Sequence, residues 1–281
     1  MLIDAHSHVD RYGLVDEHAL PSALAEIAQH RILTISNSMD LPSYRRNLEI
    51  SERCDLVLPI FGVHPWNAPE NVDRLKDLNE AIESSPMIGE VGLDYYFEDP
   101  ATYPAQRRVF EYFLSAAKEQ NKIVSLHTKG AEREVLEVLD RYDPQRVIVH
   151  WYSGPVDILS ELVAMGAYFT VGIEVLYSEH IRAIAQEVPL NRLLTETDNP
   201  GGPAGFIGRP GTPVLLQDVV RGIAQARKTA PEAIIQAVQA NLMELIRDNQ
   251  WLEEKCGLDK NRFRLHNTGD AGPVSQAVLP N

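Results

Sequence analysis

Histidines and carboxylates stand at the ends of short apolar runs in this 281-residue chain. The first run is followed by His6 and His8, and a spacing of two turns both imidazoles to the same side of a strand. Later runs end at residues of the same chemical types: Glu90, His127, His150 and Asp198. Imidazoles and carboxylates together are ligands for divalent cations. A lone histidine at a strand end is more often a hydrogen-bonded structural residue, but the joint pattern indicates a centre for a pair of ions.

The elements that must position these residues are short, mostly β-branched or apolar runs. They predict eight strands, at residues 2–5, 32–35, 57–62, 87–91, 123–126, 147–149, 168–171 and 193–195. The runs lack an apolar–polar alternation, as expected of parallel strands buried on both faces. Helical periodicity fills the stretches between them, over 104–120, 131–142, 156–165 and 180–187.

Eight strand–helix repeats predict an α/β fold of the (β/α)8 TIM-barrel type. The alternative is an open doubly wound sheet, but no glycine-rich phosphate loop follows any strand. Because barrel active sites lie at the carboxyl ends of the strands, the histidines and carboxylates are expected to meet on one rim. A Gly/Pro-rich loop at 199–213 and two further helices, at 214–228 and 231–251, follow the last strand. We expect a barrel domain over 1–254 and a partly irregular tail over 255–281.

Composition narrows the function classes. Apolar residues make up 44% of the chain and charged residues 23%, which excludes global disorder. The net charge is −14, and an acidic field of this size disfavours non-specific binding to nucleic acid or to an anionic membrane. We find no secretory leader and no apolar run long enough for a membrane helix. Cys54 and Cys256 belong to no cysteine cluster, so a reduced, cytoplasmic setting is expected.

The segments DAHSHVD, GVHPW, IGEVGLDYY, SLHTKG, VHWYSG and TETDNP, in this order, resemble the TatD family of metal-dependent hydrolases. The resemblance covers roughly the first 250 residues, includes Asn241 in the last helix, and implies the same barrel fold. It also implies how two divalent ions (Mg²⁺, Mn²⁺ or Zn²⁺) are bound. One ion would be held by His6, His8, Glu90 and Asp198. The other would be held by Glu90, His127 and His150.

The resemblance further implies hydrolysis by water that two metals activate. Asp198 would be the general base and Glu90 the carboxylate that bridges the ions. His64, Lys129 and Arg209 would orient an anionic group of the substrate. Two departures from the family affect these contacts: Lys129 stands where the family often has Arg, and the loop from Arg209 is one residue longer. Tyr95 or its neighbour can stack on a base, although packing at the rim is an equal alternative.

Three functions remain open from the sequence. The resemblance favours a deoxyribonuclease that acts on DNA ends or on single strands. The second hypothesis is an amidohydrolase or deacylase for a small amide or ester, which fits the acidic charge more easily. It differs from the phosphotriesterase type, which bridges its metals with a carbamylated Lys where this chain has Glu90. A binding protein without activity is disfavoured because every expected ligand type is present. The oligomeric state is left open.

Overall fold

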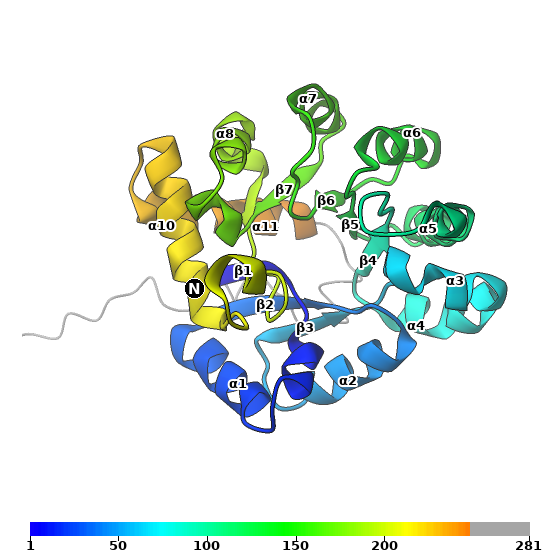
Figure 1. The fold of residues 1–281 in the computed structure, drawn as a ribbon, viewed down its shortest axis with the longest axis horizontal. Helices are drawn as coiled ribbons and strands as arrows, with labels where there is room; N and C mark the ends of the chain where they lie inside the picture. The colour runs from blue at the N-terminus through cyan, green and yellow to red at the C-terminus, as the bar shows by residue number, and fades with distance from the viewer. Residues whose placement is uncertain (248–281) are drawn as a thin grey trace, which may run out of the picture.

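The computed structural model describes residues 1–247, and these form a barrel of parallel strands inside a ring of helices (Figure 1). The strands are β1 (Leu2–Ser7), β2 (Ile32–Asn37), β3 (Val57–Ile60), β4 (Ile88–Gly92), β5 (Val124–His127), β6 (Val147–Val149), β7 (Tyr168–Val171) and β8 (Leu193–Thr195). Each predicted strand is present, with its ends within two residues of those predicted. The apolar runs of the sequence therefore identified every strand of the barrel.

Two hydrogen-bonded ladders, β1-β2-β3 and β4-β5-β6-β7-β8, meet at both of their edges. At the β3–β4 edge, the amide of Gly89 donates to the carbonyl of Phe61 over 2.9 Å. At the β8–β1 edge, the amide of Asp198 donates to the carbonyl of His6 over 2.9 Å, and the Thr195 hydroxyl donates to that of Ile3 over 2.6 Å. Both edges are therefore closed, which confirms a barrel and excludes the open sheet.

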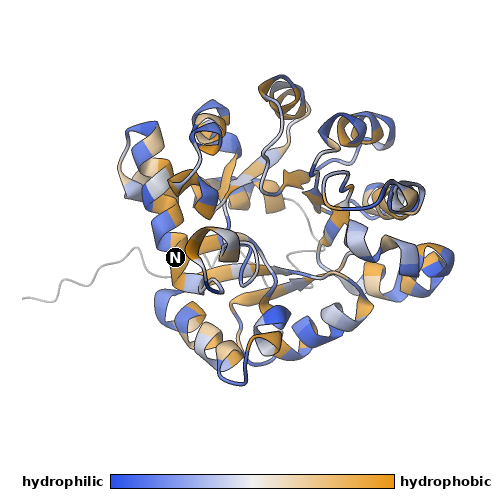
Figure 2. Ribbon diagram, in the orientation of Figure 1, coloured by the Kyte–Doolittle hydropathy of each residue, from blue (hydrophilic) through white to orange (hydrophobic). Residues whose placement is uncertain are grey.

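Helices cover the outside of the barrel and turn their apolar faces to the strands (Figure 2). In chain order they are α1 (Ala19–His30), α2 (Leu41–Ser51), α3 (Ala68–Asn71), α4 (Asn79–Ser84), α5 (Tyr103–Glu119), α6 (Glu132–Tyr142), α7 (Val156–Ala164), α8 (Glu179–Glu187) and α10 (Leu216–Arg227). A short helix, α9 (Ala204–Ile207), lies in the loop after β8. Among the described helices, none is both long enough and apolar enough to cross a membrane.

The last described helix, α11 (Pro231–Ile246), packs at the amino-terminal ends of β1 and β8, away from the predicted rim. It begins where predicted. The predicted helix end at 251, the domain end at 254 and the tail over 255–281 lie outside the described residues, as does Cys256. Cys54 is a free thiol.

Asn241 is the residue of α11 that fastens this helix to β8. Its side-chain amide donates to the carbonyls of Leu190 and Leu193 over 2.8 and 2.7 Å. Replacing Asn241 with Ala would leave two carbonyls without donors, so we expect the free energy of unfolding to fall by about 2–4 kcal/mol. Urea denaturation measures this change, and Gln236→Ala on the exposed face of α11 is the matched control. An Asn241→Ala stability equal to that of the control would contradict this role.

Candidate metal centre

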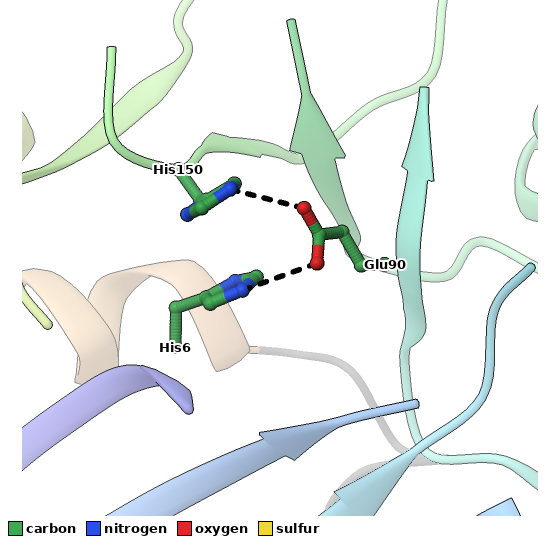
Figure 3. Close-up of side chains that lie close together, drawn as sticks. All are labelled: His6, Glu90 and His150. Carbon is green, nitrogen blue, oxygen red and sulfur yellow. Dashed lines mark ion pairs between the residues drawn. The ribbon is translucent and has the colours of Figure 1, made fainter. Parts of the chain in front are cut away.

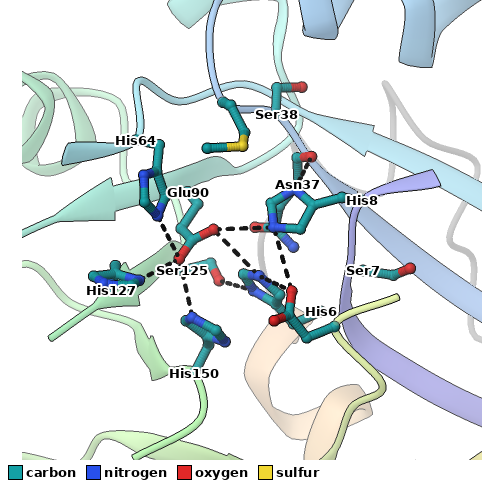
Figure 4. A network of polar contacts seen from close by, with 12 residues as sticks. His6, Ser7, His8, Asn37, Ser38, His64, Glu90, Ser125, His127 and His150 are labelled. Carbon is teal, nitrogen blue, oxygen red and sulfur yellow. Dashed lines mark hydrogen bonds and ion pairs between the residues drawn. The ribbon is translucent and has the colours of Figure 1, made fainter. Parts of the chain in front are cut away.

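Glu90 lies at the middle of the carboxyl-end rim, and each of its two oxygens faces a different group of histidines (Figures 3 and 4). Its Oε2 lies 3.3 Å from the Nε2 atoms of both His6 and His8. Its Oε1 lies 2.8 Å from His127 Nδ1 and 3.0 Å from His150 Nε2. The ends of four strands thus meet at one carboxylate, as the sequence predicted.

Asp198 completes the side of the cluster that holds the paired histidines. Its Oδ1 lies 3.4 Å from His8 Nε2 and 3.7 Å from His6 Nε2. The residue adopts a positive φ of 51°, uncommon outside glycine and less unfavourable for Asp and Asn than for most residues. Asp4 holds the segment before it, because its carboxylate accepts hydrogen bonds from the Thr197 amide over 2.9 Å and from the Thr197 hydroxyl over 2.6 Å.

Local irregularities in two strands direct the ligands into the barrel mouth. The pairing register shifts in β1 between Asp4 and Ser7, and in β4 on either side of Glu90. Such shifts re-aim side chains near active sites. Gly92 follows with a φ of 147°, and a Cβ there would collide with the carbonyl oxygen of His127. The glycine therefore lets β4 and β5 approach closely enough to keep Glu90 beside His127.

A hydrogen bond at the far nitrogen orients each of the four histidine rings around Glu90. His8 Nδ1 donates to the carbonyl of Asn37 over 3.1 Å. His127 Nε2 faces Asp94 Oδ2 at 3.0 Å, His150 Nδ1 faces Glu196 Oε2 at 3.2 Å, and His6 Nδ1 faces Ser125 Oγ at 3.4 Å. Metal-binding histidines typically have such partners, which fix the tautomer and the ring. In the neutral form of His8, this bond leaves the lone pair of Nε2 on the side of Glu90.

The donor atoms of the cluster fit divalent cations: three overlapping groups have donor atoms within 4.8 Å of one another, namely His6, Glu90 and His150; His6, His8 and Asp198; and His64, Glu90 and His127. With His8 neutral and its proton on Nδ1, the lone pair of Nε2 faces carboxylate oxygens of Glu90 and Asp198, and a cation bound between these groups would remove their mutual repulsion. His6 Nε2 is buried and has no hydrogen-bond partner within the described residues. His6, His8, Glu90 and Asp198 would hold one ion, and Glu90, His127 and His150 the other.

The buried rings differ in the direction of their pKa shifts. Burial opposes charge on His8 and His127, but hydrogen bonds and charges from neighbouring carboxylates raise the pKa of both above the ordinary value. Burial lowers the pKa of His6 well below its ordinary value, and the ring of His150 adds to the effect. Burial also opposes charge on His150, but Glu90 and Glu196 hold the pKa of His150 well above its ordinary value. The rings of His6 and His150 stack with centroids 3.7 Å apart, so a positive charge on one opposes a positive charge on the other. Burial would raise the pKa of Glu90, but the surrounding imidazoles hold it well below its ordinary value.

Burial raises the pKa of the Asp198 carboxyl to about 6, although His8 and His150 act against this. A carboxylate with a pKa near neutrality is a suitable proton acceptor at physiological pH. Asp198, a predicted ligand, therefore also has a carboxyl group suited to accept a proton.

His64 lies in the same cluster and presents a proton to Glu90. The backbone amide of Trp66 donates to His64 Nδ1 over 3.2 Å, so the neutral ring carries its proton on Nε2. That Nε2 lies 3.5 Å from Glu90 Oε1. Burial lowers the pKa of His64 to about 4, which keeps the ring neutral at physiological pH. The ring is thus arranged as a hydrogen-bond donor.

The three predicted substrate contacts lie in loops of the same rim. Lys129 follows β5, and its Nζ lies 2.8 Å from Ser153 Oγ and 5.9 Å from the ring centroid of Tyr96. Arg209 is exposed in the loop after β8. The ring of Tyr95 stacks on that of Tyr103 with centroids 3.8 Å apart, so one of its faces is used in packing.

Comparison with known proteins identifies the family of this chain. The sequence model of the family described as TatD related DNase matches residues 3–247. The chain belongs to this TatD family. A relative from Bacillus subtilis, the uncharacterized metal-dependent hydrolase YabD, is 30% identical over 260 residues, which are 89% of this chain and 100% of the relative. The uncharacterized metal-dependent hydrolase YcfH of Escherichia coli K12 is 29% identical, over 87% of this chain and 95% of its own length.

The solved structure of the TatD homolog YjjV from Escherichia coli K12 superposes with a TM-score of 0.79 at 27% sequence identity. The match covers 87% of this chain and 97% of YjjV. Fold and family predicted from the sequence are therefore both confirmed.

Sequence reasoning on this TatD chain assigned no role to three carboxylates that support the ligands. Asp94 orients His127, Glu196 orients His150, and Asp4 holds the segment that carries Asp198. For two of these carboxylates, the spacing in the sequence could have indicated a place beside the predicted ligands. Asp4 and Glu196 each precede a predicted ligand by two residues, and residues two apart in an extended chain share a face.

Proposed function

We propose that this TatD chain is a deoxyribonuclease that hydrolyses phosphodiester bonds at DNA ends or in single strands, with two divalent ions bound at Glu90. One observation carries the proposal: the two oxygens of Glu90 face separate histidine groups, as a carboxylate that bridges two ions requires. The description of the family as TatD related DNase supports DNA as the substrate.

In the proposed reaction, the divalent ions would lower the pKa of a water molecule and polarise an oxygen of the phosphate. Asp198 accepts the proton that the attacking water loses. His64 donates a hydrogen bond from Nε2 to an oxygen on which negative charge develops. Lys129 and Arg209 attract the phosphates on either side, each as a cation at the rim.

The acidic charge of the chain limits which kinds of DNA substrate it can bind. A net charge of −14 opposes a tight, non-specific hold on long duplex DNA. Part of it lies in the carboxylates of the cluster itself, which two divalent ions would offset. We therefore propose weak binding of ends or short single strands. We also propose a cytoplasmic location, because Cys54 and Cys256 belong to no cysteine cluster.

We expect purified protein supplied with Mn²⁺ or Mg²⁺ to degrade a fluorescently labelled single-stranded oligonucleotide, and to lose this activity in excess chelator. The dependence arises because, among residues 1–247, every group of donors close enough to hold an ion lies in the cluster around Glu90. Gel electrophoresis of the products measures cleavage, and re-addition of the ion is the control for irreversible damage. Intact DNA together with hydrolysis of small amides or esters by the same preparation would favour the amidohydrolase alternative.

A further inference from the structure

Two groups of exposed aromatic side chains flank the metal centre on the loops of the carboxyl-end rim. The first platform comprises Trp66, Tyr96 and Phe97, from the loops after β3 and β4. The second platform comprises the exposed Tyr177 and Phe206 and the partly buried Trp151, from the loops after β7, β8 and β6. Tyr96 is 70% exposed and Phe97 is 62% exposed, and neighbouring exposed apolar side chains of this kind mark surfaces that bind a ligand or partner.

Asp94 ties the first platform directly to the metal centre. Its Oδ2 accepts hydrogen bonds from Trp66 Nε1 over 2.8 Å and from the metal ligand His127 over 3.0 Å. Its Oδ1 accepts the backbone amides of Tyr96 and Phe97 over 3.0 and 2.8 Å. One carboxylate therefore fixes a metal ligand and every member of this platform, so the rings have a defined place beside the site.

Glu196 makes an equivalent connection to the second platform. Its Oε2 faces His150 Nδ1 at 3.2 Å and accepts the Thr170 hydroxyl over 2.6 Å. The same hydroxyl oxygen accepts the backbone amide of Trp151 over 3.0 Å. The ring of Phe206 is 38% exposed and lies nearly parallel to the rings of Trp151 and Tyr177, with centroids 6.1 and 5.6 Å away.

We propose that the two platforms stack on the nucleobases on either side of the phosphate held at the metal centre. This inference rests on the proposed function and specifies its substrate as a strand whose bases are unpaired over at least two nucleotides. Aromatic faces bind any base and need no positive charge. They therefore supply the affinity that a chain of net charge −14 cannot obtain from a cationic groove. Lys129, close to the Tyr96 ring, adds one phosphate contact beside the first platform.

The decisive experiment measures binding separately from cleavage. Fluorescence anisotropy gives the Kd of a labelled oligothymidylate for the non-cleaving Asp198→Asn protein in Mn²⁺. Phe97→Ala and Phe206→Ala, each added to that protein, are expected to weaken binding by about 5- to 100-fold, the range for losing one stacked base. Leu48→Ala, at an exposed apolar residue of the outer helix α2, is the matched control and should leave the Kd unchanged. Thermal melting of each variant confirms that it is folded.

A second arm keeps the protein constant and changes the DNA. Replacing the two nucleotides on either side of one phosphate of the oligothymidylate by abasic sites removes their bases but retains every backbone charge. We expect a similar loss of affinity. The logarithm of the affinity should also fall with the logarithm of salt concentration with a slope of only about −1 to −2, as for one to three phosphate contacts.

Failure of the platforms is distinguishable from failure of the proposed function. If wild-type protein cleaves DNA but abasic DNA and both phenylalanine variants bind with unchanged Kd, the platforms are not base-binding surfaces and the nuclease proposal stands. If wild-type protein leaves DNA intact, the nuclease proposal fails on its own measurement.

Discussion

Replacing Asp198 with Asn is expected to lower the turnover of DNA cleavage by about 10²–10⁴-fold and to leave the barrel folded. The Asn amide cannot accept a proton from water. It is also a poorer metal ligand than the carboxylate of Asp198, whose Oδ1 lies 3.4 Å from His8 Nε2. Folding should survive because Asn is tolerated at the positive φ of 51° that Asp198 adopts. Rapid-quench measurement of cleavage under saturating Mn²⁺ gives the turnover number.

Two controls separate the base role of Asp198 from its ligand role. Asp77→Asn makes the same chemical change at an exposed residue outside the rim, and it should leave turnover unchanged. Calorimetric titration with Mn²⁺ shows whether the Asp198 variant still binds two ions. A variant that binds both ions and has lost turnover supports the base assignment. Wild-type turnover in Asp198→Asn would show that another group takes the proton.

The barrel could be predicted because its strands carry a simple physical signature. A parallel strand covered by helices on one side and by the barrel interior on the other is apolar along its whole length. Runs such as 147–149 and 193–195 were therefore recognisable although they are short, and the order of strands followed from the repeat. The chain order also placed His6 and Asp198 side by side, because the first and last strands of a closed barrel are neighbours.

Side-chain roles that depend on orientation were less accessible. The sequence places Tyr95, Tyr96 and Phe97 together, but only the structure shows Tyr95 packed on Tyr103 and its two neighbours exposed. The proton on His64 Nε2 follows from a hydrogen bond that the backbone amide of Trp66 donates to Nδ1. Asp94 lies four residues beyond Glu90 in an irregular loop, where spacing does not determine the direction of a side chain. Function at this rim thus depends on contacts between loops that sequence periodicity does not describe.

Replacing Glu90 with Gln is expected to have the largest effect on metal binding. Glu90 is the one predicted ligand shared by both ions, with an oxygen 2.8 Å from His127 and another 3.3 Å from His6. An uncharged amide offers one oxygen in place of two, so the affinity for a second ion should fall by more than about 100-fold. Calorimetric titration with Mn²⁺ should then give a stoichiometry of one ion or fewer. DNA cleavage should decline by about 10³-fold or more, because the rate depends on both ions.

The matched control is Glu80→Gln on the exposed surface of α4, which should bind two ions as the wild type does. Glu90→Asp separates charge from reach, because it retains the negative charge but shortens the side chain by one methylene. If Glu90 acts as a bridge between the ions, Glu90→Asp should also bind fewer than two ions tightly. If Glu90 only balances the charge of the histidines, the Glu90→Asp protein should bind both ions tightly and the Glu90→Gln protein should not. Two tightly bound ions in Glu90→Gln would remove the central support for a two-metal site.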